Sequence, residues 1–66
     1  MSMIPRPNAA FIHLWLAARY PRWTITFDRS LAVWGAERKL PGGVRFVADH
    51  SPAGLRAKIE QAEGRS

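Results

Sequence analysis

The chain has 66 residues and no cysteine, and its ten lysines and arginines outnumber five aspartates and glutamates for a formal net charge of +5 at pH 7. A chain of this length builds at most one small core, and the lack of cysteine excludes a disulfide framework and a thiolate metal site. Hydrophobic residues make up 47% of the chain, which excludes a disordered tail. The positive net charge indicates that the protein binds nucleic acid or another acidic partner, or that the charge simply aids solubility.

The longest apolar run, residues 9–18, is interrupted by His13. It has about half of the roughly 20 residues that a membrane-spanning helix needs. The run begins after two prolines and leads into Arg19-Tyr20-Pro21 without a small-residue cleavage site, unlike a signal peptide. Because the absence of cysteine also fits a reducing compartment, we expect a cytoplasmic protein that does not enter a membrane.

We expect a single domain over residues 8–63, preceded by a flexible arm at 1–7 and followed by a frayed tail at 64–66. Asn8 is a favourable N-cap for a helix over residues 9–19, which Pro21 would end. At about 100° per residue, the apolar side chains of this helix cover roughly 200° of its circumference, more than one buried face requires. Either the helix is deeply buried or part of its surface contacts a partner.

After this helix the apolar period changes to two, which predicts a strand at residues 23–27. A turn at residues 28–30 leads to a second strand at residues 31–38, and the short connection predicts an antiparallel hairpin.

The length of the hairpin loop decides which side chains of the second strand face inward. A loop of two or four residues places Ala32, Trp34 and Ala36 beside Ile25, whereas a loop of three residues places Leu31 and Val33 there. We expect Trp34 to face inward.

Residues 40–43 read Leu-Pro-Gly-Gly and predict a loop. The alternation after them predicts a third strand with Phe46 inward and Val47 outward. Ser51 and Pro52 then combine a side-chain cap with proline at the first helical position, and they predict a second helix that ends at Gly64.

The predicted order is therefore α-β-β-β-α, an α+β fold in which two helices pack on one face of a three-stranded antiparallel meander. The inward positions of these elements predict a core of Phe11, Leu14, Trp15, Ile25, Phe27, Phe46, Leu55 and Ile59.

No set of residues has the spacing of a catalytic or metal site. His13 and His50 are the only imidazoles, and neither belongs to a metal-binding motif. Asp28 and Asp49 are interpreted as a turn residue and as part of a helix start, not as an acid and a base. The positions of the serines suggest no Ser-His-Asp triad. A phosphate-binding loop is glycine-rich and precedes a helix, whereas the Gly-Gly pair at 42–43 precedes a strand. We therefore expect no enzymatic activity, no cofactor and no metal.

The element order in so short a chain resembles the double-stranded RNA-binding domain. The resemblance implies contacts with RNA through the first helix, the first hairpin loop and the start of the second helix. In this chain the loop at residues 28–30 differs from the Gly-Pro-x-His type segment of that family, and residues 51–58 lack its lysine-rich cluster. The resemblance therefore concerns topology and carries over no RNA-binding residue.

Residues 20–63 are also similar to a group of short, arginine-rich actinobacterial proteins of unknown function. The similarity lies in Tyr20-Pro21-Arg22-Trp23, in Trp34-Gly35-Ala36, and in Ala48-Asp49-His50-Ser51 leading to Leu55-Arg56. It implies a small domain of mixed helix and sheet from a high-GC genome, and it implies no functional residue.

Two functions remain open from the sequence. The first is a non-enzymatic protein-interaction module, a homodimeric accessory or regulatory protein, because one small core cannot hide all of the apolar surface. Its candidate partner-binding residues are Ile12, Trp15, Leu16, Trp34 and Val47. The second is a protein that binds nucleic acid weakly through phosphate contacts alone. Its candidate contacts are Arg22, Arg38, Lys39 and Arg45.

Overall fold

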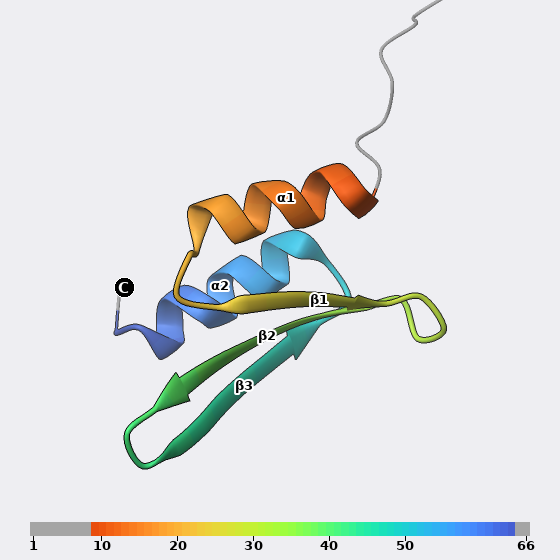
Figure 1. Ribbon diagram of the computed structural model, residues 1–66. Helices are drawn as coiled ribbons and strands as arrows, with labels where there is room; N and C mark the ends of the chain where they lie inside the picture. The colour runs from red at the N-terminus through yellow and green to blue at the C-terminus, as the bar shows by residue number, and fades with distance from the viewer. Residues whose placement is uncertain (1–8, 65–66) are drawn as a thin grey trace, which may run out of the picture.

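The computed structural model describes residues 9–64. Its elements are α1 (Ala9–Arg19), β1 (Thr24–Asp28), β2 (Val33–Leu40), β3 (Gly43–Asp49) and α2 (Pro52–Ala62). The strands form one antiparallel sheet in the order β1-β2-β3, and both helices cover the same face of it (Figure 1). The predicted α+β class and α-β-β-β-α order are thus confirmed. The predicted arm at residues 1–7 and the Asn8 cap lie outside the described residues.

The β1–β2 hairpin has a loop of four residues, 29–32, because Asp28 pairs with Val33. The backbone N–H of Leu31 donates to the Asp28 carboxylate at 3.1 Å, and Ala32 has a φ of 53°. The Asp28 side chain thus closes the turn, as is common for aspartate. The predicted start of this strand at residue 31 is wrong, because the loop extends to residue 32.

This four-residue loop places Trp34 inward, as expected. Trp34 pairs with Phe27, and Ala36 pairs with Ile25. The Phe27 and Trp34 rings pack at a centroid distance of 4.5 Å. The inward face of the β1–β2 hairpin is therefore aromatic at the end near its loop.

The β2–β3 hairpin has a loop of only two residues, since Leu40 pairs with Gly43. This register sets Val47 opposite Ala36 on the inward face. Phe46 consequently lies on the outer face of the sheet and is 63% exposed. The predictions that Phe46 is a core residue and that Val47 faces outward are both wrong.

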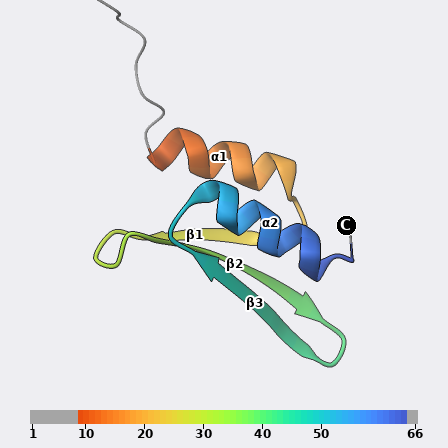
Figure 2. The same cartoon turned by 180° about the vertical axis from the view of Figure 1, so that it is seen from behind.

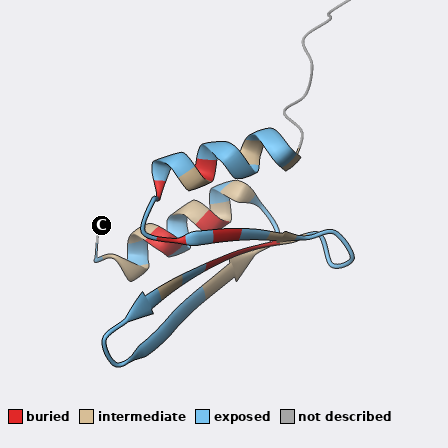
Figure 3. Cartoon of the chain, in the orientation of Figure 1, coloured by how far each residue is buried: buried red, intermediate tan, exposed pale blue. Residues whose placement is uncertain are grey.

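The core lies between the sheet and the two helices, where the buried residues cluster (Figure 3). It consists of Leu16, Tyr20, Trp23, Ile25, Trp34, Ala36, Leu55 and Ile59. The predictions for Ile25, Leu55 and Ile59 are confirmed, and Phe27 is half-buried against them. Tyr20 and Trp23, which follow α1, enter a core that the sequence analysis assigned to other residues.

Helix α1 turns a different face to the core from the one predicted. Leu16 is fully buried, whereas Phe11, Leu14 and Trp15 are 59%, 71% and 43% exposed. The Nε2 atom of His13 donates to the backbone carbonyl oxygen of Ile25 at 2.7 Å and joins this helix to the edge strand β1. The assignment of Phe11, Leu14 and Trp15 to the core is therefore wrong.

Candidate interaction surfaces

The solvent-facing side of α1 carries a second set of apolar residues. Phe11, Leu14, Trp15 and Ala18 follow one another at i, i+3, i+4 and i+7, and all four are exposed. At about 100° per residue they form a band about 100° wide on the side of the helix away from Leu16. We call these four residues the α1 stripe. A helix that packs on a single core needs one apolar face, so the α1 stripe has no role within the core.

A shallow groove runs beside the α1 stripe, between α1 and the beginning of α2. Its volume is about 270 Å³, and its lining residues are Phe11, Ile12, Trp15, Pro52, Ala53 and Arg56. Figure 2 shows the start of α2 beneath α1, where these segments meet. Among the described residues that line it, Arg56 is the one with a charge, so the groove suits an apolar side chain.

Trp15 is held in position at the edge of this groove. The guanidinium carbon of Arg56 lies 4.8 Å from the centre of the Trp15 ring. Arg56 Nε also donates to the hydroxyl of Tyr20 at 3.3 Å, and that hydroxyl donates to Glu60 Oε2 at 2.6 Å. The hydrogen bond with Tyr20 raises the pKa of Arg56 further above its usual value. A buried tyrosine thus fixes the cation that covers the exposed tryptophan.

Two of the predicted partner-binding residues are core residues. Leu16 is fully buried and Trp34 is 4% exposed, so neither is accessible to a partner. Val47 is half-buried and packs against the core. Trp15 is exposed and Ile12 lines the groove. The exposed apolar surface that the sequence indicated exists, but it lies on the opposite side of α1 from Leu16.

The outer face of the sheet carries a smaller apolar area. Val44 and Phe46 are 56% and 63% exposed there. The Phe46 ring covers Gly35, because a Cβ atom added at Gly35 would lie 3.2 Å from the ring. This area is on the face of the sheet that the helices do not cover, so it is separate from the α1 stripe.

The predicted basic residues converge at one end of the molecule. One depression of about 440 Å³ is lined by Arg19, Tyr20, Pro21, Arg22, Arg38 and Glu63. A neighbouring depression is lined by Arg22, Thr24, Glu37, Arg38 and Lys39. Arg45 lies directly opposite Arg38 on the adjacent strand. We call the cationic residues of this region the basic cluster: Arg19, Arg22, Arg38, Lys39 and Arg45.

The basic cluster is far from the surface that the resemblance to the double-stranded RNA-binding domain implies. The β1–β2 loop, the start of α1 and the start of α2 lie together at one end of the sheet, and the β2–β3 turn lies at the other end (Figures 1 and 2). The loop contributes Arg29, and α2 contributes Arg56, which is engaged with Trp15 and Tyr20.

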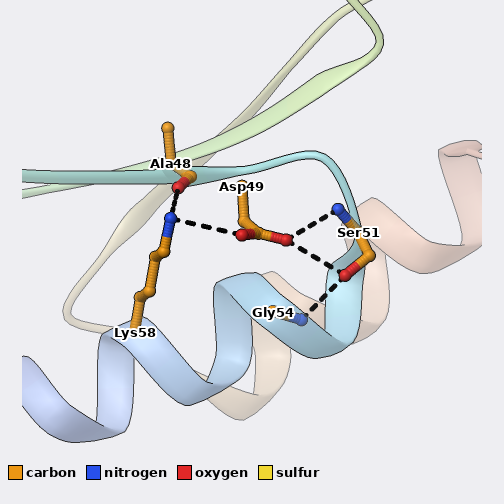
Figure 4. Close-up of polar contacts among 5 residues, drawn as sticks. All are labelled: Ala48, Asp49, Ser51, Gly54 and Lys58. Atoms are coloured by element: carbon orange, nitrogen blue, oxygen red, sulfur yellow. Dashed lines mark hydrogen bonds and ion pairs between the residues drawn. The ribbon is translucent and has the colours of Figure 1, made fainter.

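Asp49 and Ser51 form a structural network at the start of α2 (Figure 4). Asp49 Oδ2 accepts from the backbone N–H and the hydroxyl of Ser51, each at 3.0 Å, and Ser51 Oγ accepts from the backbone N–H of Gly54. Lys58 Nζ lies 3.2 Å from Asp49 Oδ1 and donates to the Ala48 carbonyl oxygen. The Ser51 backbone N–H, ahead of Lys58 and the Ser51 hydroxyl, lowers the pKa of Asp49. Every polar group of this network is used in joining β3 to α2.

Within residues 9–64, no group of three or more histidine, aspartate or glutamate side chains is arranged to hold a metal ion. None of the helices described is long and apolar enough to cross a membrane.

Comparison of the chain with known protein families, with curated proteins and with solved structures finds no match. Its function is therefore inferred from its own surfaces, of which the α1 stripe and the basic cluster are the two most distinctive.

Proposed function

We propose that this chain is a non-enzymatic protein-interaction module that forms a homodimer through the α1 stripe. The observation that carries the proposal is the exposure of three large apolar side chains, Phe11, Leu14 and Trp15, on a helix that already buries its other face. Contiguous apolar surface of this kind is uncommon on a soluble monomer and marks interaction sites.

A second copy of the chain is the partner that this surface suits best. Phe11 is exposed and lines the groove between α1 and α2, and Leu14 is exposed about one turn further along the α1 stripe. Each copy therefore has the protruding α1 stripe next to the groove. In a dimer with two-fold symmetry, the stripe of each copy can insert into the groove of the other. Such self-complementarity is what a two-fold interface requires. The spacing i, i+3, i+4, i+7 is also typical of paired helices.

The charges near the α1 stripe allow an antiparallel pairing of the two helices. The four stripe residues are uncharged, and Arg19 is the basic residue in the last turn of α1. In an antiparallel arrangement the two copies of Arg19 lie at opposite ends of the interface, so they do not face each other. The contact between Trp15 and Arg56 exists already in the single chain, and this preorganisation reduces the entropy cost of association.

A small domain also gains stability from such an interface. A core of eight buried residues is marginal in a chain of this size. A second copy that binds only the folded state shifts the folding equilibrium toward that state.

The proposal is tested by sedimentation equilibrium at about 100 μM protein, a concentration at which modest dimers are populated. The disrupting variant is Leu14→Glu, and the matched control is Val44→Glu. Both replace an exposed apolar residue with a carboxylate, but Val44 lies on the outer face of the sheet. We expect the wild type and Val44→Glu to be dimers and Leu14→Glu to be a folded monomer by circular dichroism.

Two outcomes contradict the proposal. A wild-type chain that is monomeric at this concentration excludes the homodimer, and a different protein must then cover the α1 stripe. Dissociation by Val44→Glu but not by Leu14→Glu places the interface on the sheet.

A further inference from the structure

The basic cluster is assembled from three separate parts of the chain. Arg19 ends α1, Arg22 lies in the turn before β1, and the other three cations belong to the β2–β3 hairpin. The pairing of β1 ends at Thr24 and Glu37, so β2 and β3 continue beyond β1. In Figure 1 this hairpin projects past the end of β1 and away from both helices. Its end is therefore accessible on more than one side.

The positive charge of the five cations exceeds the negative charge around them. Within residues 9–64 none of them forms an ion pair with a carboxylate, and the ion pair that is formed there joins Lys58 to Asp49. The carboxylates that line the same depressions are Glu37 and Glu63. Glu63 accepts a hydrogen bond from Trp23 Nε1 at 2.9 Å. The region thus carries a clear excess of positive charge.

The pairing of Arg38 with Arg45 predicts that this excess of positive charge lowers the stability of the hairpin. They are direct cross-strand partners, and like charges placed directly opposite each other in a sheet are destabilising. An anion bound between them would remove this repulsion. Arginine is also suited to phosphate, because its planar group donates two parallel hydrogen bonds.

We infer that the basic cluster binds the phosphate backbone of nucleic acid, at a site separate from the α1 stripe. A chain of phosphates fits better than a single phosphate, because Arg22 and Arg38 line both depressions and join them into one continuous surface. Lys39 also lines the second depression. It points to the opposite face of the sheet from its neighbour Arg38, so the surface continues around the edge of β2 beyond the end of β1. The cations therefore lie along a track that follows the end of the sheet.

Recognition at this track depends on charge and not on base sequence. Tyr20, the aromatic residue that lines the first depression, is 2% exposed, so it offers no face on which a base can stack. Phosphate contacts alone add affinity but read no sequence. The structure therefore predicts weak binding that falls steeply with salt concentration.

The test measures fluorescence anisotropy of labelled duplex RNA, duplex DNA and single-stranded DNA, each of about 20 nucleotides, and of labelled polyglutamate as an acidic polypeptide. Titrations are run at about 50 and 200 mM salt, a range over which phosphate contacts lose much of their strength. Arg38→Glu is the test variant, since the new carboxylate faces Arg45 and keeps the hairpin paired. Arg29→Glu changes the net charge equally at the opposite end of the sheet.

We expect the wild type to bind the nucleic acids at the lower salt concentration, with a loss of about tenfold or more at the higher one. Arg38→Glu should weaken binding at least about tenfold and reduce the salt dependence, whereas Arg29→Glu should change affinity by less than about twofold. Arg38→Glu should also melt at a higher temperature than the wild type, because it removes the repulsion.

Three results would overturn the inference. The first is no binding of any nucleic acid by the wild type at the lower salt concentration. The second is an equal loss in Arg38→Glu and Arg29→Glu, which would show that net charge alone is responsible. The third is binding of polyglutamate as tight as that of nucleic acid, which would assign the cluster to acidic polypeptides.

Discussion

The guanidinium group of Arg56 covers the exposed ring of Trp15, with 4.8 Å between the guanidinium carbon and the ring centre. The Arg56 side chain is held in place by the core, because its Nε donates a hydrogen bond to the hydroxyl of the buried Tyr20. The surface tryptophan is thus ordered from beneath by a chain of contacts that begins at Glu60.

This relationship predicts that Arg56→Lys weakens the homodimer. A lysine cannot stack its head group on Trp15 and reach Tyr20 with a planar donor at the same time. A cation–π contact at an exposed site makes a modest contribution, so we expect a loss of about two- to fivefold in dimer affinity for each Arg56–Trp15 contact that is removed. Sedimentation equilibrium measures it, with Arg29→Lys as the control. An unchanged affinity would mean that Trp15 needs no support from Arg56.

A second prediction concerns the two fully buried residues of α2, Leu55 and Ile59. Their truncation to alanine should cost about 2–5 kcal/mol. The total stability expected for a domain of this size is roughly 5 kcal/mol, so either variant should lose a large part of it and melt at a much lower temperature than the wild type. Urea denaturation measures the loss, and Leu31→Ala, at a 66% exposed loop position, should change stability by less than about 0.5 kcal/mol. Melting points close to that of the wild type for both α2 variants would refute the core assignment.

A third prediction is that Gly54→Ala destabilises the protein although it replaces glycine within a helix. Such a change normally stabilises a helix by about 1 kcal/mol. Here the new Cβ atom would overlap with Asp49 Oδ2, so the Asp49 network has to shift. Thermal denaturation should show a lower melting point for Gly54→Ala. In an Asp49→Ala background the same substitution should regain its usual stabilising sign, and the absence of that reversal would argue against the clash.

A fourth prediction links acid sensitivity to Asp49. Its pKa is lowered from the usual 3.8, mainly by the Ser51 backbone N–H. Because the folded pKa lies below the unfolded one, the ionised carboxylate stabilises the fold above about pH 4, and this contribution is lost as the pH falls through the lower value. Asp49→Asn should therefore lose less stability than the wild type on acidification.

Urea midpoints measured from about pH 6 to pH 3 would show this difference. Lys58→Gln should reduce the acid sensitivity without abolishing it, because the Ser51 hydrogen bonds remain. Parallel pH profiles for the wild type and Asp49→Asn would contradict the role of this carboxylate.

A fifth prediction is that salt acts in opposite directions on the two proposed interactions. Each chain carries a formal net charge of +5, so two copies repel each other, and added salt should strengthen the homodimer by screening. The same salt should weaken nucleic-acid binding by reducing counterion release. Measuring both constants in one salt series checks this, and a homodimer that added salt weakens would contradict an interface formed by the uncharged α1 stripe.

The order of the elements could be predicted from the sequence because each boundary has a local cause. Asp28 closes the first hairpin through its own side chain, and Ser51 caps α2. Ile25, Leu55 and Ile59 were correctly assigned to the core, since alternation in a strand and the i, i+4 spacing in a helix identify them directly.

The orientation of α1 could not be predicted in the same way. Apolar side chains cover two faces of this helix, and contacts outside it decide which face is buried. These contacts are the His13 bond to the Ile25 carbonyl oxygen and the burial of Tyr20. The width of the apolar arc did indicate a surplus face, but not which one.

The side chains of β3 that face inward could have been predicted from the register of the β2–β3 hairpin. Trp34 and Ala36 face inward, and the two-residue turn at Pro41-Gly42 then places Val47 opposite Ala36. Counting from Trp34 through this turn gives the observed register, whereas alternation within the strand alone does not tell which of the two sets, that of Phe46 or that of Val47, faces inward. The convergence of Arg22 with Arg38 depends on how the α1–β1 turn meets the sheet, which no local pattern encodes.

The hydrogen bonds of Tyr20 and Trp23 have a consequence for how the chain folds as it is made. Tyr20 bonds to Glu60 and Trp23 bonds to Glu63, and each bond spans 40 residues. The side chains of Tyr20 and Trp23, which lie just after α1, can therefore form these hydrogen bonds only after the last turns of α2 have been made. The two hairpins can pair earlier, because their strands are close together in the sequence. A chain truncated before Glu60 would lose the acceptors of the Tyr20 hydroxyl and the Trp23 N–H, and a domain weakened in this way is more exposed to chaperones and proteases. Docking of the last turn of α2 is thus required before the hydrogen bonds of Tyr20 and Trp23 can form.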